Sequence, residues 1–343
     1  MERANFYSDT QSRPSLAMLE TALTAEVGDE QSDRDPTTLA LCERVADLLG
    51  HEAAIFLPSG TMCNEIALAV HTKPGDEVIC HRLSHIVTSE AGGPAQMSGL
   101  MIHMLDGPQG MFTAEDVAGA VRSGSRYEPR SRVLSLEQTM NFGGGAVWPL
   151  EQMKSVVGAG RAAGLACHLD GARLLNACAA SGVAARDYGG LFDSVWIDFT
   201  KGLGAPVGAV LAGSRDFIGQ AWRFKQRWGG AMRQSGVLAA MCDYALEQNV
   251  ERLAQDNALA KSIGSRLAEM AGVASVLPVD TNIVIFDLIE DAPEAARVVA
   301  AMQERDIRVG ALGKRRMRMV THLDVNAEDA ELALRELGKV LAA

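Results

Sequence analysis

Residues 192–213 read Phe-Asp-Ser-Val-Trp-Ile-Asp-Phe-Thr-Lys-Gly-Leu-Gly-Ala-Pro-Val-Gly-Ala-Val-Leu-Ala-Gly. Two apolar runs of strand character, 194–199 and 207–212, flank a glycine-rich turn, and Lys201 follows the first run. A lysine held between buried strands gives up hydration, which makes its amine a usable nucleophile toward carbonyl groups. A turn lysine that points into water is the alternative, and the local residues leave both interpretations open.

The chain before Lys201 alternates short apolar strands with helical segments. Such alternation predicts an α/β fold with a mostly parallel central sheet that helices cover on both faces. The pattern changes after Arg233, where long helices and then strand, helix, strand and helix predict a smaller α+β unit. We therefore expect two domains: a large one over 1–249 with an N-terminal arm, and a small C-terminal one over 250–343.

Composition excludes several classes of function. The chain has 343 residues and a formal net charge of -11, which argues against a nucleic-acid partner and against binding to an anionic membrane. Its six cysteines are scattered without metal-ligand spacing, so we expect no metal site and free thiols in a reducing cytosol. No apolar run approaches the roughly 20 residues that span a bilayer, so we expect a cytoplasmic protein. Arg223, Lys225 and Arg227 are interpreted as a solvated basic helix face.

An acid precedes Lys201 by about one strand-helix-strand unit. In His168-Leu-Asp-Gly-Ala-Arg173, Asp170 ends an apolar strand. Strand ends of an open α/β sheet face one cleft, so this carboxylate and the amine of Lys201 can meet there. The pair suits pyridoxal phosphate, because the acid keeps the pyridine nitrogen protonated and the lysine forms a Schiff base. Alternatively, Asp170 is a helix cap.

Two further segments carry candidate cofactor residues. Ser59-Gly60-Thr61 precedes a helix, where backbone N–H groups favour a phosphate, although such a sequence is equally a capped turn. His85 could stack on a pyridine ring or move protons, and the alternative is a structural histidine. Glu90 lies five residues on, in a segment that also suits a solvated helix.

The motifs together resemble a known family. They are Ser8-Asp9-Thr10, Asp35-Pro36-Thr37, Pro58-Ser-Gly-Thr61, His85-Ile with Glu90-Ala-Gly-Gly93, His168-Leu-Asp-Gly-Ala-Arg173, Thr200-Lys-Gly-Leu-Gly-Ala-Pro-Val-Gly208, Met232-Arg-Gln234 and Val320-Thr-His-Leu-Asp324. In this order they resemble the L-threonine aldolase family through nearly the whole chain. The resemblance implies the aspartate-aminotransferase-like fold of pyridoxal phosphate enzymes, fold type I. It also implies a homotetramer or dimer whose active sites form between subunits.

The resemblance implies roles for the cofactor residues. Lys201 resembles the Schiff-base lysine, Asp170 the acid at the pyridine nitrogen, and His85 the histidine that stacks on the ring. Gly60 and Thr61 resemble the cradle of the cofactor phosphate.

Other residues resemble those that contact the substrate or border the cofactor. Ser8, Arg173 and Arg318 resemble the group that holds the substrate carboxylate, and Arg173 also borders the cofactor. Arg233 resembles a basic residue that reaches the cofactor site from a neighbouring subunit. The activity implied is cleavage of a threonine-like β-hydroxy-α-amino acid into glycine, or a related small amino acid, and an aldehyde.

One loop departs from the family pattern. The family commonly has Glu-Asn-Thr-His-Asn where this chain has Glu-Gln-Thr-Met-Asn over 137–141, so Met140 replaces a histidine beside the substrate hydroxyl. In one explanation the base is His85 or a water near Glu90, and Met140 lines a wider, drier substrate pocket. In the other, the reaction has changed to that of a β-eliminating lyase or a transaldolase. A homologue that binds the cofactor without turnover is a third hypothesis.

Overall fold

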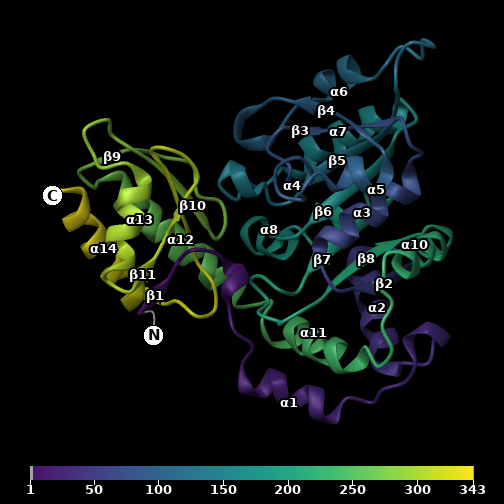
Figure 1. The fold of residues 1–343 in the computed structure, drawn as a ribbon, viewed down its shortest axis with the longest axis horizontal. Helices are drawn as coiled ribbons and strands as arrows, with labels where there is room; N and C mark the ends of the chain where they lie inside the picture. Colours follow the sequence, from purple (N-terminus) through teal and green to yellow (C-terminus); the bar gives the residue numbers. More distant parts are fainter. Residues whose placement is uncertain (1–2, 343) are drawn as a thin grey trace.

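A seven-stranded sheet forms the centre of the larger of two lobes (Figure 1). The computed structural model describes residues 3–342. The strands are β2 (Ala53–Leu57), β3 (Asp76–His81), β4 (Met101–Leu105), β5 (Arg130–Glu137), β6 (Ala166–Gly171), β7 (Ser194–Asp198) and β8 (Ala209–Gly213). Their order is β2-β8-β7-β6-β5-β3-β4, and only β8 runs antiparallel to its neighbours. The expected α/β fold with a mostly parallel sheet is confirmed.

Helices cover both faces of this sheet. The helices of this lobe are α1 (Leu16–Thr24), α2 (Pro36–Leu49), α3 (Gly60–His71), α4 (His85–Thr88), α5 (Gly93–Ser98), α6 (Ala114–Ala120), α7 (Leu150–Ala162), α8 (Leu174–Ser181), α9 (Ala185–Gly189), α10 (Arg215–Arg227) and α11 (Gly236–Gln248), and α1 packs on α11 outside the sheet. The apolar residues of α3 and α10 pack on one face, and those of α2, α7 and α11 contribute to the core on the other. Every residue of β7 and β8 is buried, as expected for strands covered on both sides.

The smaller lobe is built on a four-stranded antiparallel sheet. Its strands are β9 (Val273–Val276), β10 (Ile283–Leu288), β12 (Gly310–Ala311) and β13 (Arg316–Val320), and its helices are α12 (Leu253–Ala268), α13 (Ala295–Gln303) and α14 (Ala327–Leu341). This confirms the smaller α+β unit. The N-terminal arm crosses to this lobe, since β1 (Ala4–Asn5) pairs with β11 (Ile307–Arg308) and Phe6 is buried in its core. The domain boundary at 249/250 stays a prediction.

Lys225 is buried, so the interpretation of a solvated basic face was wrong for this residue. Its ammonium group pairs with the carboxylate of Glu30 and lies 4.3 Å from the ring centroid of Trp222. The physical reason is helical spacing, because Phe217, Ala221 and Lys225 follow one another at four-residue intervals on the apolar face of α10. Burial lowers the pKa of Lys225, and the ion pair with Glu30 opposes that shift.

The cysteines and the lengths of the helices bear on two expectations from the sequence. All six cysteines are free thiols, as their scattered positions suggested. Within residues 3–342, no helix has both the length and the apolar character needed to cross a membrane.

Candidate functional site

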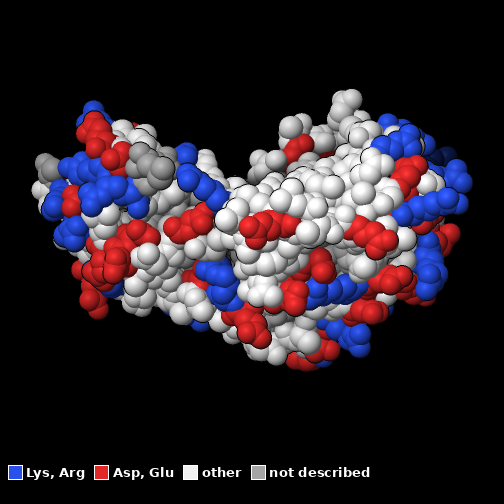
Figure 2. Space-filling model, turned by 90° about the horizontal axis from the view of Figure 1, so that it is seen from below, with Lys and Arg blue, Asp and Glu red and all other residues white. Residues whose placement is uncertain are grey.

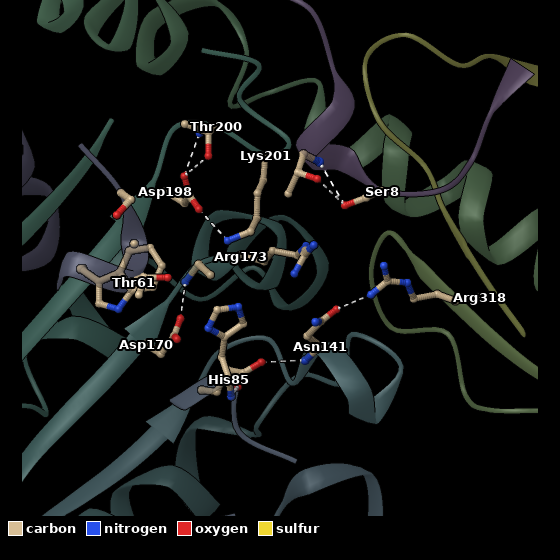
Figure 3. Close-up of a pocket in the computed structure, with 16 residues that line it drawn as sticks. Ser8, Thr61, His85, Asn141, Asp170, Arg173, Asp198, Thr200, Lys201 and Arg318 are labelled. Carbon is tan, nitrogen blue, oxygen red and sulfur yellow. Dashed lines mark hydrogen bonds and ion pairs between the residues drawn. The ribbon is translucent and has the colours of Figure 1, made fainter. Parts of the chain in front are cut away.

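A cavity of about 280 Å³ lies at one edge of the large sheet, where it meets the smaller lobe (Figure 3). Its lining consists of Ser8, Thr10, Ser59, Gly60, Thr61, His85, Glu137, Asn141, Asp170, Ala172, Arg173, Trp196, Asp198, Thr200, Lys201 and Arg318. The sheet explains the convergence, because the carboxyl ends of β2, β3, β5, β6 and β7 meet at this edge. Eight of the candidate residues line the cavity: Ser8, Gly60, Thr61, His85, Asp170, Arg173, Lys201 and Arg318.

Lys201 points into the cavity beside Asp198, which ends β7 (Figure 3). The lysine Nζ lies 2.5 Å from Asp198 Oδ2. The other carboxylate oxygen, Oδ1, accepts hydrogen bonds from the backbone N and Oγ1 of Thr200, at 2.8 and 2.7 Å. The turn therefore holds the carboxylate, and the carboxylate holds the amine at the centre of the site.

Asp170 is fixed at the end of β6 by two donors. Its Oδ1 accepts a hydrogen bond from the backbone N of Ala172 at 3.1 Å, and its Oδ2 accepts one from Asn64 Nδ2 at 2.9 Å. The Asn64 amide is itself oriented, since its Oδ1 accepts from Trp196 Nε1 at 2.7 Å and from His168 Nε2 at 3.1 Å. The carboxylate is thus held in one orientation by a buried network.

His85 lies among three carboxylates. Its Nδ1 is 2.7 Å from Glu90 Oε1, and its backbone N donates to Glu137 Oε2 at 2.8 Å. Burial of the ring lowers the pKa of His85, but the hydrogen bond that the ring donates to Glu90 and the charges of Asp170, Glu90 and Glu137 outweigh it, so the pKa is raised. Burial, reinforced by the charge of Asp170, raises the pKa of Glu137 itself to about 7. The imidazole therefore favours its charged form more than a free histidine does.

The N-terminus of α3 forms a second wall. Ser59 caps the helix, because its Oγ accepts a hydrogen bond from the backbone N of Met62 at 3.3 Å. A side chain at Gly60 would place its Cβ 2.1 Å from Cη2 of Trp196, so only glycine fits between the helix and that ring. The N–H groups of the first turn, together with Thr61, face an anion-binding position at the cavity edge.

The two candidate arginines differ in their bonding. Arg173 donates from Nε and Nη2 to the two oxygens of Asp9, at 2.7 and 2.6 Å, and is almost fully buried. Arg318 donates to Asn141 Oδ1 at 3.1 Å and to the carbonyl of Tyr7 at 3.3 Å, and its buried Nε has no hydrogen-bond partner within residues 3–342. Both arginines line the cavity, and the buried Nε without a partner shows that Arg318 has donor capacity left for an anion.

Three candidate residues lie outside the lining. Glu90 is buried behind His85. Met140 is also buried, against Gly110 and Gly143, and reaches the cavity only through its neighbour Asn141. Arg233 lies on the surface, where Nη1 is 3.2 Å from Asp29 Oδ2.

Several known proteins with similar sequences are named as L-threonine aldolases. A family model described as beta-eliminating lyase matches residues 5–291. The chain is 41% identical over 328 residues to the low specificity L-threonine aldolase of Escherichia coli K12, covering 95% of this chain and 96% of that protein. It is 36% identical to low-specificity L-threonine aldolase 1 of Arabidopsis thaliana, covering 97% and 95%. The chain belongs to the L-threonine aldolase family.

Solved structures agree with this family at the level of the fold. A putative L-allo-threonine aldolase from Listeria monocytogenes has a TM-score of 0.80 at 25% identity, covering 99% of this chain and 97% of that one. The threonine aldolase of Leishmania major has a TM-score of 0.84 at 21% identity, covering 98% and 99%. The expected fold type I architecture is confirmed.

The residues of this threonine aldolase family member fit pyridoxal 5′-phosphate. The cavity offers a lysine amine for its aldehyde, a fixed carboxylate for its ring nitrogen, an imidazole for its ring and a helix N-terminus for its phosphate. The chain is a pyridoxal 5′-phosphate-dependent lyase, so the cofactor and the enzyme class expected from the sequence are confirmed.

Sequence reasoning missed several residues of the site. Asp198 carried a usable signal, since an acid three residues before a candidate lysine in a strand-to-turn segment can reach its amine. Asn64 carried none, because an asparagine in the first turns of a helix is common and its partners come from three other elements. The sequence motif placed Glu137 in a loop and assigned it no role. In the structure its Oε1 accepts a hydrogen bond from the backbone N of Asn141 at 2.9 Å.

Proposed function

We propose that this enzyme cleaves the Cα–Cβ bond of a β-hydroxy-α-amino acid, releasing glycine or a related small amino acid and an aldehyde. The observation that carries the proposal is the meeting of Lys201, Asp170 and His85 in one cavity with the unsatisfied guanidinium of Arg318. The cofactor supplies an electron sink for the pair released from the breaking bond.

Binding of the amino acid is assigned to the rim of the cavity. Arg318, with the hydroxyl of Ser8 and the guanidinium of Arg173, would hold the substrate carboxylate. Held at one end, the substrate can present only one of its Cα bonds perpendicular to the cofactor ring, so binding geometry selects the bond that breaks.

Proton transfer at the β-hydroxyl is assigned to His85. Its Nδ1 is committed to Glu90, so its Nε2 is left for the cavity. Glu90 is buried behind the ring, and it therefore acts on the substrate through the histidine. The thioether of Met140 is not a base and cannot take up this proton, and we propose that Met140 shapes the substrate pocket by supporting Asn141.

The test is a panel of β-hydroxy-α-amino acids, with and without a substituent at Cα, incubated with the purified enzyme. We expect aldehyde and the small amino acid to appear in a one-to-one ratio, because bond cleavage produces both. Release of ammonia and a keto acid instead would favour the alternative, a β-eliminating lyase. Aldehyde exchange without net release would favour a transaldolase.

We further propose a homodimer or homotetramer with shared active sites. On α1 and the loop after it, Leu16, Leu19, Leu23 and Val27 are exposed, with Leu23 at 85%. Figure 2 views the molecule from the side that carries α1 in Figure 1, and the middle of this face has few charged residues. An apolar surface of this kind is typical of an interface between subunits. Arg233 would reach the cofactor site of the partner.

Mixing two inactive variants tests the shared site. Lys201→Ala and Arg233→Ala should each be inactive, but subunits exchanged between them should recover about a quarter of the wild-type activity, since half of the random dimers carry one intact site. Light scattering should show an oligomer for each variant. A monomer, or a mixture that stays inactive after subunit exchange, would contradict the proposal.

We also propose a cytoplasmic location and a domain division at 249/250. The six free thiols support the location, because reduced cysteines are usual in a reducing compartment. The separate apolar core of the smaller lobe supports the division.

A further inference from the structure

A buried pair of carboxyl groups lies behind His85. Glu65 is on α3 and Glu90 follows α4, and the two residues are only 5% and 6% exposed. Glu90 uses Oε1 twice, to accept from Asn64 Nδ2 at 2.7 Å and to pair with His85 Nδ1 at 2.7 Å. Its Oε2 and both oxygens of Glu65 are fully buried and have no hydrogen-bond partner within residues 3–342.

These unsatisfied oxygens lie together. Gly93 brings the two residues together, because it packs against the Glu65 carboxyl group and its backbone N donates to the carbonyl of Glu90. Two ionised carboxylates in such a site would repel each other and would both lack solvation, whereas one proton between them gives a donor and an acceptor. Burial first, and then the charge and hydrogen bond of Glu90, raise the pKa of Glu65 to about 8. Glu90 already pairs with Asn64 and His85 through Oε1, whereas neither oxygen of Glu65 has a partner among residues 3–342, so Glu65 is the member to which the shared proton is assigned.

We propose that Glu65 is a positioning residue that holds a proton at neutral pH and donates it in a hydrogen bond to Glu90 Oε2. Glu65 does not line the cavity and acts through Glu90. With Oε2 held by Glu65 and Oε1 by Asn64, the Glu90 carboxylate is fixed where it orients His85. This inference rests on the proposed role of His85 in cleavage.

Gly93 provides the space for this arrangement. A Cβ at Gly93, the first residue of α5, would lie 1.9 Å from Glu65 Oε1 and 2.6 Å from its carboxyl carbon. The backbone N of Gly93 also donates to the carbonyl of Glu90 at 2.8 Å, so the turn that carries Glu90 is packed directly on Glu65. An alanine here must displace the Glu65 carboxyl group.

The elements packed against α3 carry other titratable and charged side chains. They include Glu90 after α4, Arg130, Arg132 and Glu137 on β5, His168 and Asp170 on β6, Asp198 on β7, and Arg215, Asp216, Arg223, Lys225 and Arg227 on α10. Helix α5 has none, and Lys225 is paired with Glu30. Only Glu90 contributes an interaction to the raised pKa of Glu65, so a titration near pH 8 that depends on Glu65 reports this pair.

The first test compares Glu65→Gln with Glu65→Leu in the holoenzyme. Glutamine keeps a donor for Glu90 but cannot ionise, and leucine removes both properties. The wild type should lose kcat, and its visible cofactor absorption should change, as the pH rises through about 8. Glu65→Gln should abolish this step and keep at least about a third of the neutral-pH kcat, whereas Glu65→Leu should lower kcat about 10-fold or more with a smaller change in KM. An unchanged alkaline step in Glu65→Gln, or equal losses in the two variants, would overturn the proposal.

Thermal unfolding of the apoprotein gives a readout that does not depend on activity. A raised pKa in the folded state means that the stability from Glu65 is fully present below its usual pKa of 4.5 and is lost as the pH rises through about 8. The Tm of Glu65→Gln minus the Tm of the wild type should therefore increase between pH 4.5 and about pH 8, and this difference should stay constant at higher pH. Glu77→Gln, at a buried glutamate of β3 that pairs with Arg122, is the control and should keep the alkaline step of kcat. A constant Tm difference between wild type and Glu65→Gln would overturn the proposal.

The second test uses Gly93→Ala, alone and combined with Glu65→Gly. The single variant should lower kcat and shift the alkaline step, because the new methyl group displaces the carboxyl group of Glu65. In the Glu65→Gly background the same substitution should have no further effect. Equal losses in both backgrounds would overturn the proposal. Failure of the wild type to release aldehyde would count against the proposed cleavage, while the Tm comparison would still decide the role of Glu65.

Discussion

Replacing Lys201 with alanine is expected to abolish covalent attachment of the cofactor and to lower kcat by at least about 10³-fold. Lys201 Nζ is the amine in the cavity, held by Asp198 at 2.5 Å, and the candidate cofactor residues Gly60, Thr61, His85, Asp170 and Arg173 line the same cavity. Without the Lys201 amine, only the phosphate, the ring nitrogen and the ring face of the cofactor remain as points of attachment. The purified variant should therefore lack the visible absorbance of a lysine-bound cofactor.

The control for this experiment is Lys154→Ala. Lys154 is a surface lysine of α7 that pairs with Glu151, far from the cavity lining. This variant should keep both the absorbance and the activity. If Lys201→Ala kept the absorbance of a lysine-bound cofactor, the assignment of Lys201 would be wrong.

Asp170→Asn is expected to lower kcat by about two to three orders of magnitude, because a fixed negative charge at the cofactor ring is lost without a change in shape. The two donors that hold this side chain, Asn64 Nδ2 and the backbone N of Ala172, both need an acceptor. The asparagine side chain has one accepting oxygen and one donating NH₂ group. It can therefore keep only one of these two hydrogen bonds, and at the other position two donors would face each other.

Two measurements separate the loss of charge from a loss of folding. The Tm of the Asp170→Asn apoprotein and its capacity to form the covalent bond at Lys201 should be largely retained, while turnover falls. Asp216→Asn, at an exposed aspartate of α10, is the matched control and should leave kcat unchanged. Turnover of Asp170→Asn within a few fold of wild type would contradict the assigned role of Asp170.

The larger lobe could be predicted from the sequence because its signals are local. Apolar strands that alternate with helices specify a covered parallel sheet, and the carboxyl ends of parallel strands lie at one edge. Lys201 and Gly60 each follow such a strand and Asp170 lies at the end of one, so their convergence was predictable before any contact was known. The four-residue spacing of Phe217, Ala221 and Lys225 was a local signal for the burial of Lys225, but its partner Glu30 lies almost two hundred residues away in the chain and could not be predicted.

The parts of the site that could not be predicted depend on contacts between distant segments. Arg173 was expected to contact the substrate, but its pairing with Asp9 requires the N-terminal arm to lie against β6 and the smaller lobe. Met140 follows a polar residue in a loop that should border the cavity, yet the packing of Gly110 and Gly143 places it in the core. Glu65 shows no signal in sequence, because its partner is brought to it by the turn after α4.

The most direct test of the central claim, that Lys201 carries the cofactor of this aldolase family member, is peptide mapping after borohydride reduction of the holoenzyme. Reduction makes the bond between the cofactor and its lysine permanent, so the modified residue can be identified by mass. We predict one pyridoxyl group per chain, on Lys201. A modified Lys225, which is a fully buried lysine of α10, or an unmodified Lys201 in active enzyme would contradict the account.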